Sequence, residues 1–372
     1  MILTQSNAAK SGATVVNAIA SIANSLYNFH VLATTTISKV ISGALGVIKT
    51  GTETLIFSNI NSYSGTTTVN AGTLRLQAAA TNFYNTSNRT YNINNGSGLV
   101  FATGAATNPT LHGTIINVDS NGGATITLDA INGLVQSSAG VTFNSNGGAR
   151  NRLISLNSGF INDQGGNRPV VFNIASGSDA TADFLADCAV IGRCELTKNG
   201  SGKLLFSGGL LGTFGDGATN IRINSGTMEI GGASALLNQK SGSIFLNDGT
   251  FIWNSTAANQ TIGNAITGTG NIIKRNSGNL IFSGNNSYSG DTSIEAGTLR
   301  VTTLISGTSG KFSQANFTNT TLTVTFSVAP LAGETYQLFP GATTQSYPTV
   351  SLVGATGRTA TYNSAISTLT IA

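Results

Sequence analysis

The chain has 372 residues, of which 46 are Gly and 40 are Asn, and only 9% are charged. A net charge of +4 with 40% hydrophobic residues excludes a charge-driven disordered chain. The abundance of Gly and Asn, which are poor helix formers, disfavours a helical protein, and five prolines without a Gly-X-Y period exclude collagen. The class that remains is a large all-β protein with many tight turns.

Charge and cysteine content exclude further classes. The basic residues are scattered, with no run longer than Lys274-Arg275, so the basic stripe of a nucleic-acid-binding protein is missing. No stretch approaches the roughly 18 apolar residues of a transmembrane helix. The cysteines, Cys188 and Cys194, lack a neighbouring His and do not form a zinc site. They either close a small loop as a disulfide in an oxidising compartment or are both free thiols.

We expect residues 1–30 to form an N-terminal helical cap or connector. Val15, Ile19, Ile22 and Leu26 follow the spacing of a helix face over residues 5–29, and Ser6 or Ser11 suits its start. We expect this helix to cover one end of a β structure. The alternative, a helix on a membrane surface, would need more Lys and Arg on its polar face than Lys10.

An internal repeat organises residues 31–310. Residues 46–76 and 271–301 are identical at 17 of 31 positions without gaps, and a looser third copy occupies residues 194–230. Each copy has two short apolar strands joined by Gly-containing corners, and such a unit buries its apolar face only when it is stacked on its neighbours. The repeat therefore predicts a parallel β-helix (β-solenoid), in which Asn and Thr side chains of successive coils form hydrogen-bonded ladders.

Two further segments depart from this texture. Asp179, Asp183 and Asp187 have helical spacing, which predicts a short inserted helix with a solvated acidic face. The alternative is a metal site built from the three carboxylates, but three carboxylates on one helix face repel each other and do not surround an ion. Residues 311–372 hold three of the five prolines and several alternating runs. They predict a small C-terminal antiparallel β unit that acts as a cap or connector.

The two clear copies resemble the autotransporter-associated β-strand repeat of bacterial surface proteins. The resemblance lies in Asn-x-Tyr-Ser-Gly-x-Thr followed by Ala-Gly-Thr-Leu, and the residues assigned to structural corners are Tyr63, Gly65, Gly72, Tyr288, Gly290 and Gly297. It implies a passenger-type β-solenoid at a bacterial cell surface or outside the cell, and it implies no catalytic residues. Family members usually have a signal peptide and a membrane barrel or anchor, and neither is recognised here, which suggests a released or assembled subunit.

The sequence offers no catalytic, cofactor or metal constellation. The two histidines, His30 and His112, suggest no Ser-His-Asp arrangement. A carbohydrate-active enzyme would need carboxylates gathered on one face, and acids such as Glu229 and Glu295 are isolated in the sequence. We therefore expect a non-enzymatic protein without cofactors.

Three functions remain from the sequence. The first is a structural subunit that joins end to end with copies of itself, through its terminal segments, into a surface filament or layer. The second is an adhesin or glycan-binding passenger module whose partners include cell-surface glycans. The third is a β-helical spike of a phage or virus. The low charge favours self-packing, and nucleic acid is excluded as a partner.

Overall fold

The structure is a computed structural model of the chain. It describes residues 2–4, 13–15, 26–78, 89–103, 110–111, 113–129, 134–136, 140–156, 160–163, 168–190, 194–207, 210–211, 220–232, 235–236, 242–256, 258–307 and 310–372. The chain divides into two compact units, Met1–Leu205 and Phe206–Ala372. They are called unit 1 and unit 2.

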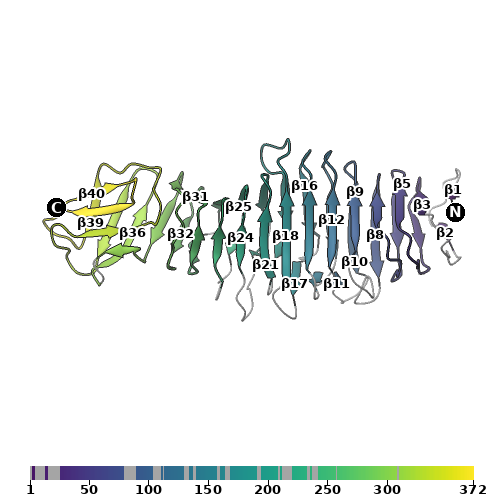
Figure 1. Cartoon of the computed structure of the whole chain (residues 1–372), viewed down its shortest axis with the longest axis horizontal. Coiled ribbons are helices and arrows are strands. Elements are labelled where there is room, and N and C mark those ends of the chain that lie inside the picture. The colour runs from purple at the N-terminus through teal and green to yellow at the C-terminus, as the bar shows by residue number, and fades with distance from the viewer. Residues whose placement is uncertain are drawn as a thin grey trace. The chain divides into compact units, whose positions relative to one another are not determined.

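The first sheet of unit 1 is a stack of parallel strands in the order β1-β3-β5-β7-β9-β12-β15-β18-β21 (Figure 1). Its strands are β1 (Ile2–Thr4), β3 (Tyr27–His30), β5 (Val47–Thr50), β7 (Thr67–Val69), β9 (Thr90–Ile93), β12 (Thr114–Val118), β15 (Val141–Ser145), β18 (Arg168–Ile174) and β21 (Cys194–Asn199).

A second sheet of unit 1 alternates with the first along the chain, in the order β2-β4-β6-β8-β10-β13-β16-β19. Its strands are β2 (Ala13–Val15), β4 (Thr35–Ile37), β6 (Thr54–Phe57), β8 (Thr73–Ala78), β10 (Gly98–Thr103), β13 (Thr125–Asp129), β16 (Asn151–Ser155) and β19 (Phe184–Asp187). A third, shorter parallel sheet consists of β11 (Thr110–Leu111), β14 (Leu134–Gln136), β17 (Phe160–Asp163) and β20 (Ala189–Val190). Each coil thus contributes one strand to each long sheet, and the predicted parallel β-solenoid is confirmed.

The core of unit 1 consists of inward side chains stacked from coil to coil. One column of paired positions contains Leu55, Leu74, Leu99, Ile126 and Leu153, all with no exposed surface. Strands expose alternate residues to opposite faces, so the apolar residue at every second position turns inward. Burying each such side chain stabilises the fold by about 1.5–3 kcal/mol. A single coil cannot bury these side chains without the coils on either side of it.

Unit 2 contains further parallel coils. One ladder pairs β24 (Ile221–Ile223), β27 (Ile244–Leu246) and β30 (Ile266–Gly268); another pairs β25 (Thr227–Gly232), β28 (Thr250–Ser255), β31 (Asn271–Lys274) and β33 (Thr292–Ile294). A third pairs β29 (Gln260–Ile262), β32 (Asn279–Phe282) and β34 (Thr298–Val301), and a short one pairs β23 (Leu210–Leu211) with β26 (Ala235–Leu236). Strand β22 (Lys203–Phe206) contains the boundary between the units.

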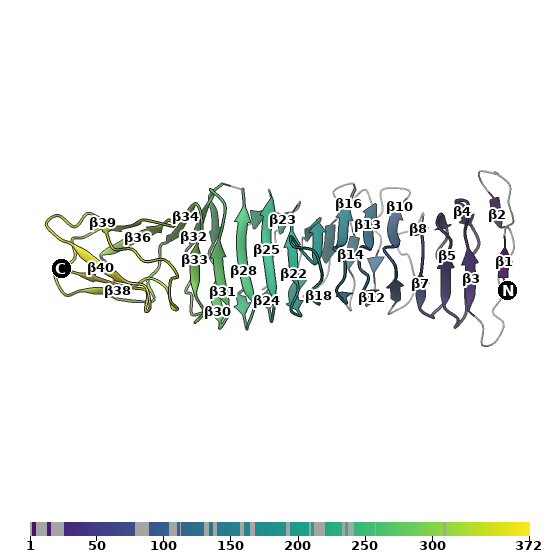
Figure 2. The ribbon, with the colours of Figure 1, turned by 90° about the horizontal axis from the view of Figure 1, so that it is seen from above.

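The predicted C-terminal antiparallel β unit is also confirmed. In the sheet of β34, β36 (Phe312–Phe317) runs antiparallel to β34, and β37 (Leu322–Phe326) runs antiparallel to β36 (Figure 2). The sheet ends with β39 (Val350–Val353), which is parallel to β37. A four-stranded antiparallel sheet adds β35 (Ser306–Gly307), β38 (Thr335–Gln337), β41 (Thr368–Ile371) and β40 (Ala360–Asn363).

Within unit 2, the segment around Ala342 and Thr344 also forms backbone hydrogen bonds with the last coil. The Thr292 amide donates to the carbonyl oxygen of Ala342 at 2.8 Å, and the Thr344 amide donates to the carbonyl oxygen of Thr292 at 3.0 Å. The outer edge of β33 is therefore bonded to the chain's own C-terminal segment, just as that of β34 is bonded to β36.

The helix expected over residues 5–29 is wrong where the structure describes that segment; its remainder lies outside the described residues. Ala13–Val15 and Tyr27–His30 are strands, and Tyr27 and Phe29 are buried against the next coil through the pairing of β3 with β5. The β-branched and aromatic residues satisfy a period of two at these positions, and pairing with the adjacent coil outweighs the helical spacing.

The short helix expected around Asp179–Asp187 is also wrong. Phe184–Asp187 forms β19, and Phe184 and Ala186 point into the core. No helix occurs anywhere in the segments enumerated above, and accordingly none of them contains a helix long and apolar enough to cross a membrane.

Candidate functional site

The repeat tyrosines form the same hydrogen bond in both copies. Tyr63 and Tyr288 have no exposed surface. The Tyr63 hydroxyl lies 2.6 Å from the Thr67 Oγ1, and the Tyr288 hydroxyl lies 2.7 Å from the Thr292 Oγ1. Burial raises the pKa of Tyr288 well above its ordinary range. Each pair therefore joins a neutral phenol to the start of the following strand, inside the coil, where it cannot contact a ligand.

The repeat asparagines bond to the preceding coil. The Asn61 Oδ1 accepts a hydrogen bond of 2.8 Å from the Ile41 amide, and the Asn286 Oδ1 accepts one of 3.0 Å from the Ile266 amide. Both side chains are buried. A buried amide N–H without a partner is costly, so these asparagines satisfy a backbone donor at a corner where the ladder of strands is interrupted.

The four repeat glycines occupy corners that a side chain would obstruct. A Cβ on Gly65 would lie 2.3 Å from the Gly46 nitrogen, and a Cβ on Gly290 would lie 2.3 Å from the Gly270 carbonyl oxygen. Gly72 and Gly297 have φ angles of 65° and 70°, in the left-handed region that glycine adopts at low cost. The coils can stack at the strand spacing only because these positions lack a side chain.

Three buried lysines complete the corners. Lys49, Lys198 and Lys274 point inward from the ends of their strands and have no exposed surface. The Lys274 Nζ donates to the carbonyl oxygens of Arg275 and Asn276, both at 2.6 Å, and to that of Ala296 at 3.1 Å. The ammonium thus joins the corner of one coil to the Ala-Gly corner of the next.

The other two lysines have comparable contacts. The Lys49 Nζ donates to the carbonyl oxygens of Gly51 at 2.6 Å and Ala71 at 2.8 Å, and the Lys198 Nζ donates to those of Asn199 at 2.9 Å and Gly200 at 2.8 Å. Burial lowers the pKa of each of the three ammonium groups to about 8. A charged group that is both buried and bonded to backbone carbonyls acts as a structural clamp.

Sequence reasoning overlooked these lysines, although the sequence held a signal for them. Lys49 and Lys274 occupy the same position in the two clear copies, and Lys198 stands before the same kind of turn in the third. In a chain with so few charges, a lysine repeated at an inward position indicates a specific buried contact.

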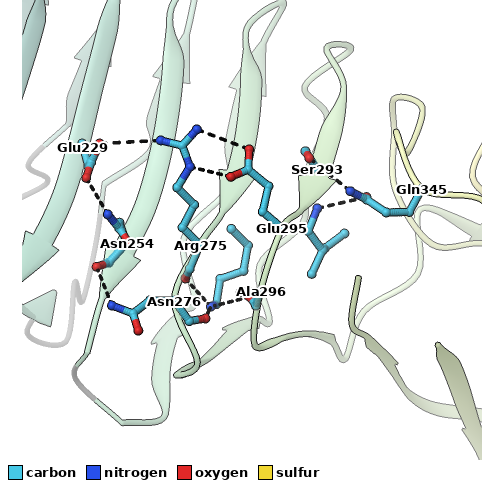
Figure 3. A network of polar contacts seen from close by, with 10 residues as sticks. Glu229, Asn254, Arg275, Asn276, Ser293, Glu295, Ala296 and Gln345 are labelled. Carbon is cyan, nitrogen blue, oxygen red and sulfur yellow. Dashed lines mark hydrogen bonds and ion pairs between the residues drawn. The ribbon is translucent and has the colours of Figure 1, made fainter. Parts of the chain in front are cut away.

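Two carboxylates of unit 2 share one arginine (Figure 3). The Arg275 Nε donates to the Glu295 Oε2 at 2.6 Å, and its Nη1 lies 4.0 Å from the Glu229 Oε2. Asn254 donates a further hydrogen bond of 2.8 Å to the Glu229 Oε1. Glu229 and Glu295 are isolated in the sequence but share one arginine in space, an arrangement that cross-links neighbouring coils.

Asp179 and Asp183 in unit 1 accept hydrogen bonds from backbone amides. The Asp183 carboxylate accepts hydrogen bonds from the amides of Gly177 at 2.6 Å and Lys203 at 2.7 Å. Asp179 accepts hydrogen bonds from the amides of Ala182 at 3.1 Å and Thr181 at 2.8 Å, and these two donors lower the pKa of Asp179. Among the residues that the structure describes, no group of acidic, His or Cys side chains has a metal-binding arrangement.

Cys188 is a free, buried thiol, and burial raises its pKa to about 12. The backbone of Cys194 begins β21, but its side chain lies outside the described part of the chain. The two sequence alternatives, a disulfide between these cysteines in an oxidising compartment or two free thiols, both stay predictions.

The outward face of the first sheet in unit 1 carries an asparagine ladder. Each amide Nδ2 donates to the Oδ1 one coil below, at distances between 2.7 and 2.9 Å, and the chain of donors runs through Asn199, Asn173, Asn144, Asn117 and Asn92. The predicted Asn ladder is thereby confirmed. Unlike the buried corners, these side chains are half-buried and reach solvent.

A groove of about 380 Å³ runs beside the ladder and is lined by Asn117, Asn144 and Asn173 together with Asn146, Ala175 and Ser201. On the other side of the ladder lies a column of paired residues two positions earlier in the same strands, Ile115, Thr142 and Val171. Since residues i and i+2 share a face of a strand, the groove, the amide column and this column of β-branched residues lie on one surface. Of the surfaces that the structure describes, this is the candidate functional site.

Comparisons with known proteins agree with this architecture. Residues 47–76 and 272–301 match the model of the passenger-associated-transport repeat (PATR). The chain therefore carries autotransporter passenger repeats on a β-solenoid, and the resemblance found in the sequence is confirmed.

One curated protein is distantly similar to the chain. The adhesin BmaC autotransporter of Brucella suis biovar 1 (strain 1330) is 31% identical over 126 residues, which cover 32% of this chain and 4% of that protein. The chain thus matches only a small part of the length of this relative. No solved structure gives a significant match.

Proposed function

We propose that the chain is a non-enzymatic, adhesin-type passenger segment displayed at the bacterial cell surface. The observation that carries this proposal is the pair of passenger repeats together with the distant likeness to an autotransporter adhesin. The burial of the motif side chains supports it, because Tyr63, Tyr288 and the clamp lysines serve the interior and leave the outer faces of the coils available for contacts.

The experiment is an adhesion assay with the purified full chain on fluorescent beads. We expect the coated beads to bind cultured epithelial cells above the level of beads coated with serum albumin, and excess soluble chain to compete with them. Equal binding of both bead types, or no competition by the soluble chain, would contradict the proposal.

End-to-end assembly is the competing proposal. The low charge supports it, but the last coil edges of unit 2 are bonded to the chain's own C-terminal segment, at Thr292 and along β34. A junction there would have to use the outer strands β35, β39 or β40. Light scattering over a range of concentrations separates the two: a concentration-independent monomer argues for the adhesin and against the filament.

A further inference from the structure

The asparagine face of unit 1 has the chemistry of a binding surface for an uncharged, hydroxyl-rich chain. Every residue lining the groove beside the ladder is uncharged, and three of them, Asn117, Asn144 and Asn173, are rungs of the ladder. Binding sites are typically concave, with a few placed polar groups that fix the orientation of the ligand.

The ladder leaves hydrogen-bonding capacity unused. An asparagine amide has two N–H donors and an oxygen with two lone pairs. Asn117, Asn144 and Asn173 each donate one hydrogen bond to the rung below and accept one from the rung above. Each rung therefore keeps one N–H and one lone pair, and the bonds to its neighbours hold the amide in a fixed orientation. A preorganised donor and acceptor pair binds with less loss of entropy than a free side chain.

The spacing and the neighbouring column favour an extended saccharide. Successive rungs are separated by the inter-strand spacing of about 4.8 Å, which is close to the advance per residue of an extended pyranose chain. Alongside the rungs, Ile115 is 38% exposed and is followed in register by Thr142 and Val171. Such a column suits the apolar C–H faces of sugar rings, while the amides bond to the hydroxyl groups at their edges.

We propose that the groove and ladder of unit 1 bind a linear, neutral oligosaccharide along the direction in which the coils stack. The inference rests on the proposed adhesin function, for which it names the ligand class and the site. A structural role of the ladder alone accounts for its internal hydrogen bonds but not for the adjoining uncharged groove.

The test measures binding of the full chain to linear hexasaccharides by isothermal titration calorimetry. Cellohexaose, mannohexaose and chitohexaose are the extended neutral probes, maltohexaose is the curved comparison and a hyaluronan hexasaccharide is the charged one. We expect saturable binding of at least one extended neutral probe, and weaker binding of the curved and charged ones. No saturable binding of any extended neutral probe overturns the proposal.

Two variants locate the site. Asn144→Asp removes the donor to Asn117 and the outward N–H of the middle rung. We expect it to weaken binding about tenfold, as the loss of one well-placed hydrogen bond does. Asn247→Asp is the matched control, because it removes the same kind of ladder donor, to Asn224, outside the groove. Because the Asn247 bond is exposed, this variant should lower the melting temperature no more than Asn144→Asp does, and it should leave affinity within twofold.

A third variant tests the groove without disturbing the hydrogen bonds of the ladder. Asn146 is exposed at the groove and is not a rung of the ladder. Asn146→Lys should fill the groove, retain the wild-type melting temperature and abolish binding. Binding that survives both Asn144→Asp and Asn146→Lys overturns the assigned site. If the coated beads adhere to cells but no oligosaccharide binds, this inference is rejected and the adhesin function stands. If an oligosaccharide binds but the beads do not adhere, the adhesin function alone is rejected.

Discussion

The Lys49 Nζ donates a hydrogen bond of 2.8 Å to the carbonyl oxygen of Ala71, which lies 22 residues further along the chain. Lys274 and Ala296 are related in the same way at 3.1 Å, again 22 residues apart. One buried ammonium therefore holds two consecutive corners of the solenoid in register. This contact lies inside the coil, so the repeat motif preserves the fold and leaves the outer faces free to differ.

Replacing a clamp lysine should destabilise its unit. Lys274→Met leaves the carbonyl oxygens of Arg275, Asn276 and Ala296 without this donor, and unsatisfied buried groups cost about 1–3 kcal/mol. We expect the free energy of unfolding to fall by about 2 kcal/mol, measured by urea unfolding with the fluorescence of buried Trp253. Lys39→Met, at an exposed lysine, is the control. Equal stability of the two variants would show that the clamp contributes nothing.

The same lysines should make stability depend on pH in the alkaline range. Burial lowers the pKa of Lys274 from 10.5 to about 8, and the unfolded chain retains the ordinary value. Between these values the unfolded chain binds more protons, so the free energy of unfolding should rise as pH increases from about 8 to 10.5. Lys274→Met should show a shallower rise than the wild type. A side-chain NMR titration that places the Lys274 pKa near 10.5 would contradict the assignment.

The solenoid was predictable because its signal is repeated and local. Seventeen identities in 31 positions, with Gly at the corners and alternating apolar residues, specify coils that must stack. The N-terminal strands were missed because Val15, Ile19, Ile22 and Leu26 fit a helical period by chance. The edge of the adjacent coil, to which β3 pairs, decides the conformation there, and a local pattern contains no information about it.

The candidate site was less predictable. Its ladder partners are separated by 25, 27, 29 and 26 residues, because the coils differ in the length of their loops. No fixed sequence period therefore aligns Asn92, Asn117, Asn144, Asn173 and Asn199. The sequence predicted that Asn ladders form but could not predict where a groove would adjoin one, since the groove depends on which loops end beside the rungs.

The Tyr288–Thr292 pair should be energetically coupled. Tyr288→Phe removes the hydroxyl and leaves the buried Thr292 Oγ1 without this partner, at a cost of about 1–2 kcal/mol. Adding Thr292→Val removes the unsatisfied oxygen, so the double variant should be less destabilised than the sum of the two single variants. A double-mutant cycle by chemical unfolding measures the coupling. Strict additivity would mean that the hydroxyls do not interact.

Glu334 should protect the C-terminal sheets against acid. Its carboxylate accepts hydrogen bonds from Lys311 at 2.5 Å and from the Leu331 amide and the Tyr336 hydroxyl, both at 2.8 Å, which lowers its pKa from 4.5 to about 2. Its contribution to stability is therefore complete above pH 4.5 and is lost as pH falls from 4.5 through about 2.

Glu334→Gln should accordingly reduce stability at neutral pH and show a smaller further loss between pH 4.5 and 2 than the wild type. Tyrosine near-ultraviolet circular dichroism during an acid titration reports on Tyr336. Glu53→Gln, at an exposed position of unit 1, is the control and should leave this signal unchanged. Identical acid profiles of wild type and Glu334→Gln would refute the role of this carboxylate.

A single methyl group should separate an essential corner from a permissive one. A Cβ on Gly290 would lie 2.3 Å from the Gly270 carbonyl oxygen, whereas a Cβ on Gly263 would lie 3.6 Å from the Ser283 Oγ, an ordinary contact. Gly290→Ala must push two corners apart, and such overpacking costs about 1–3 kcal/mol. Gly263→Ala should stay within about 0.5 kcal/mol of the wild type, as surface changes usually do. Urea unfolding measures both; if Gly290→Ala is as stable as Gly263→Ala, close stacking of the corners is not what requires glycine in the repeat.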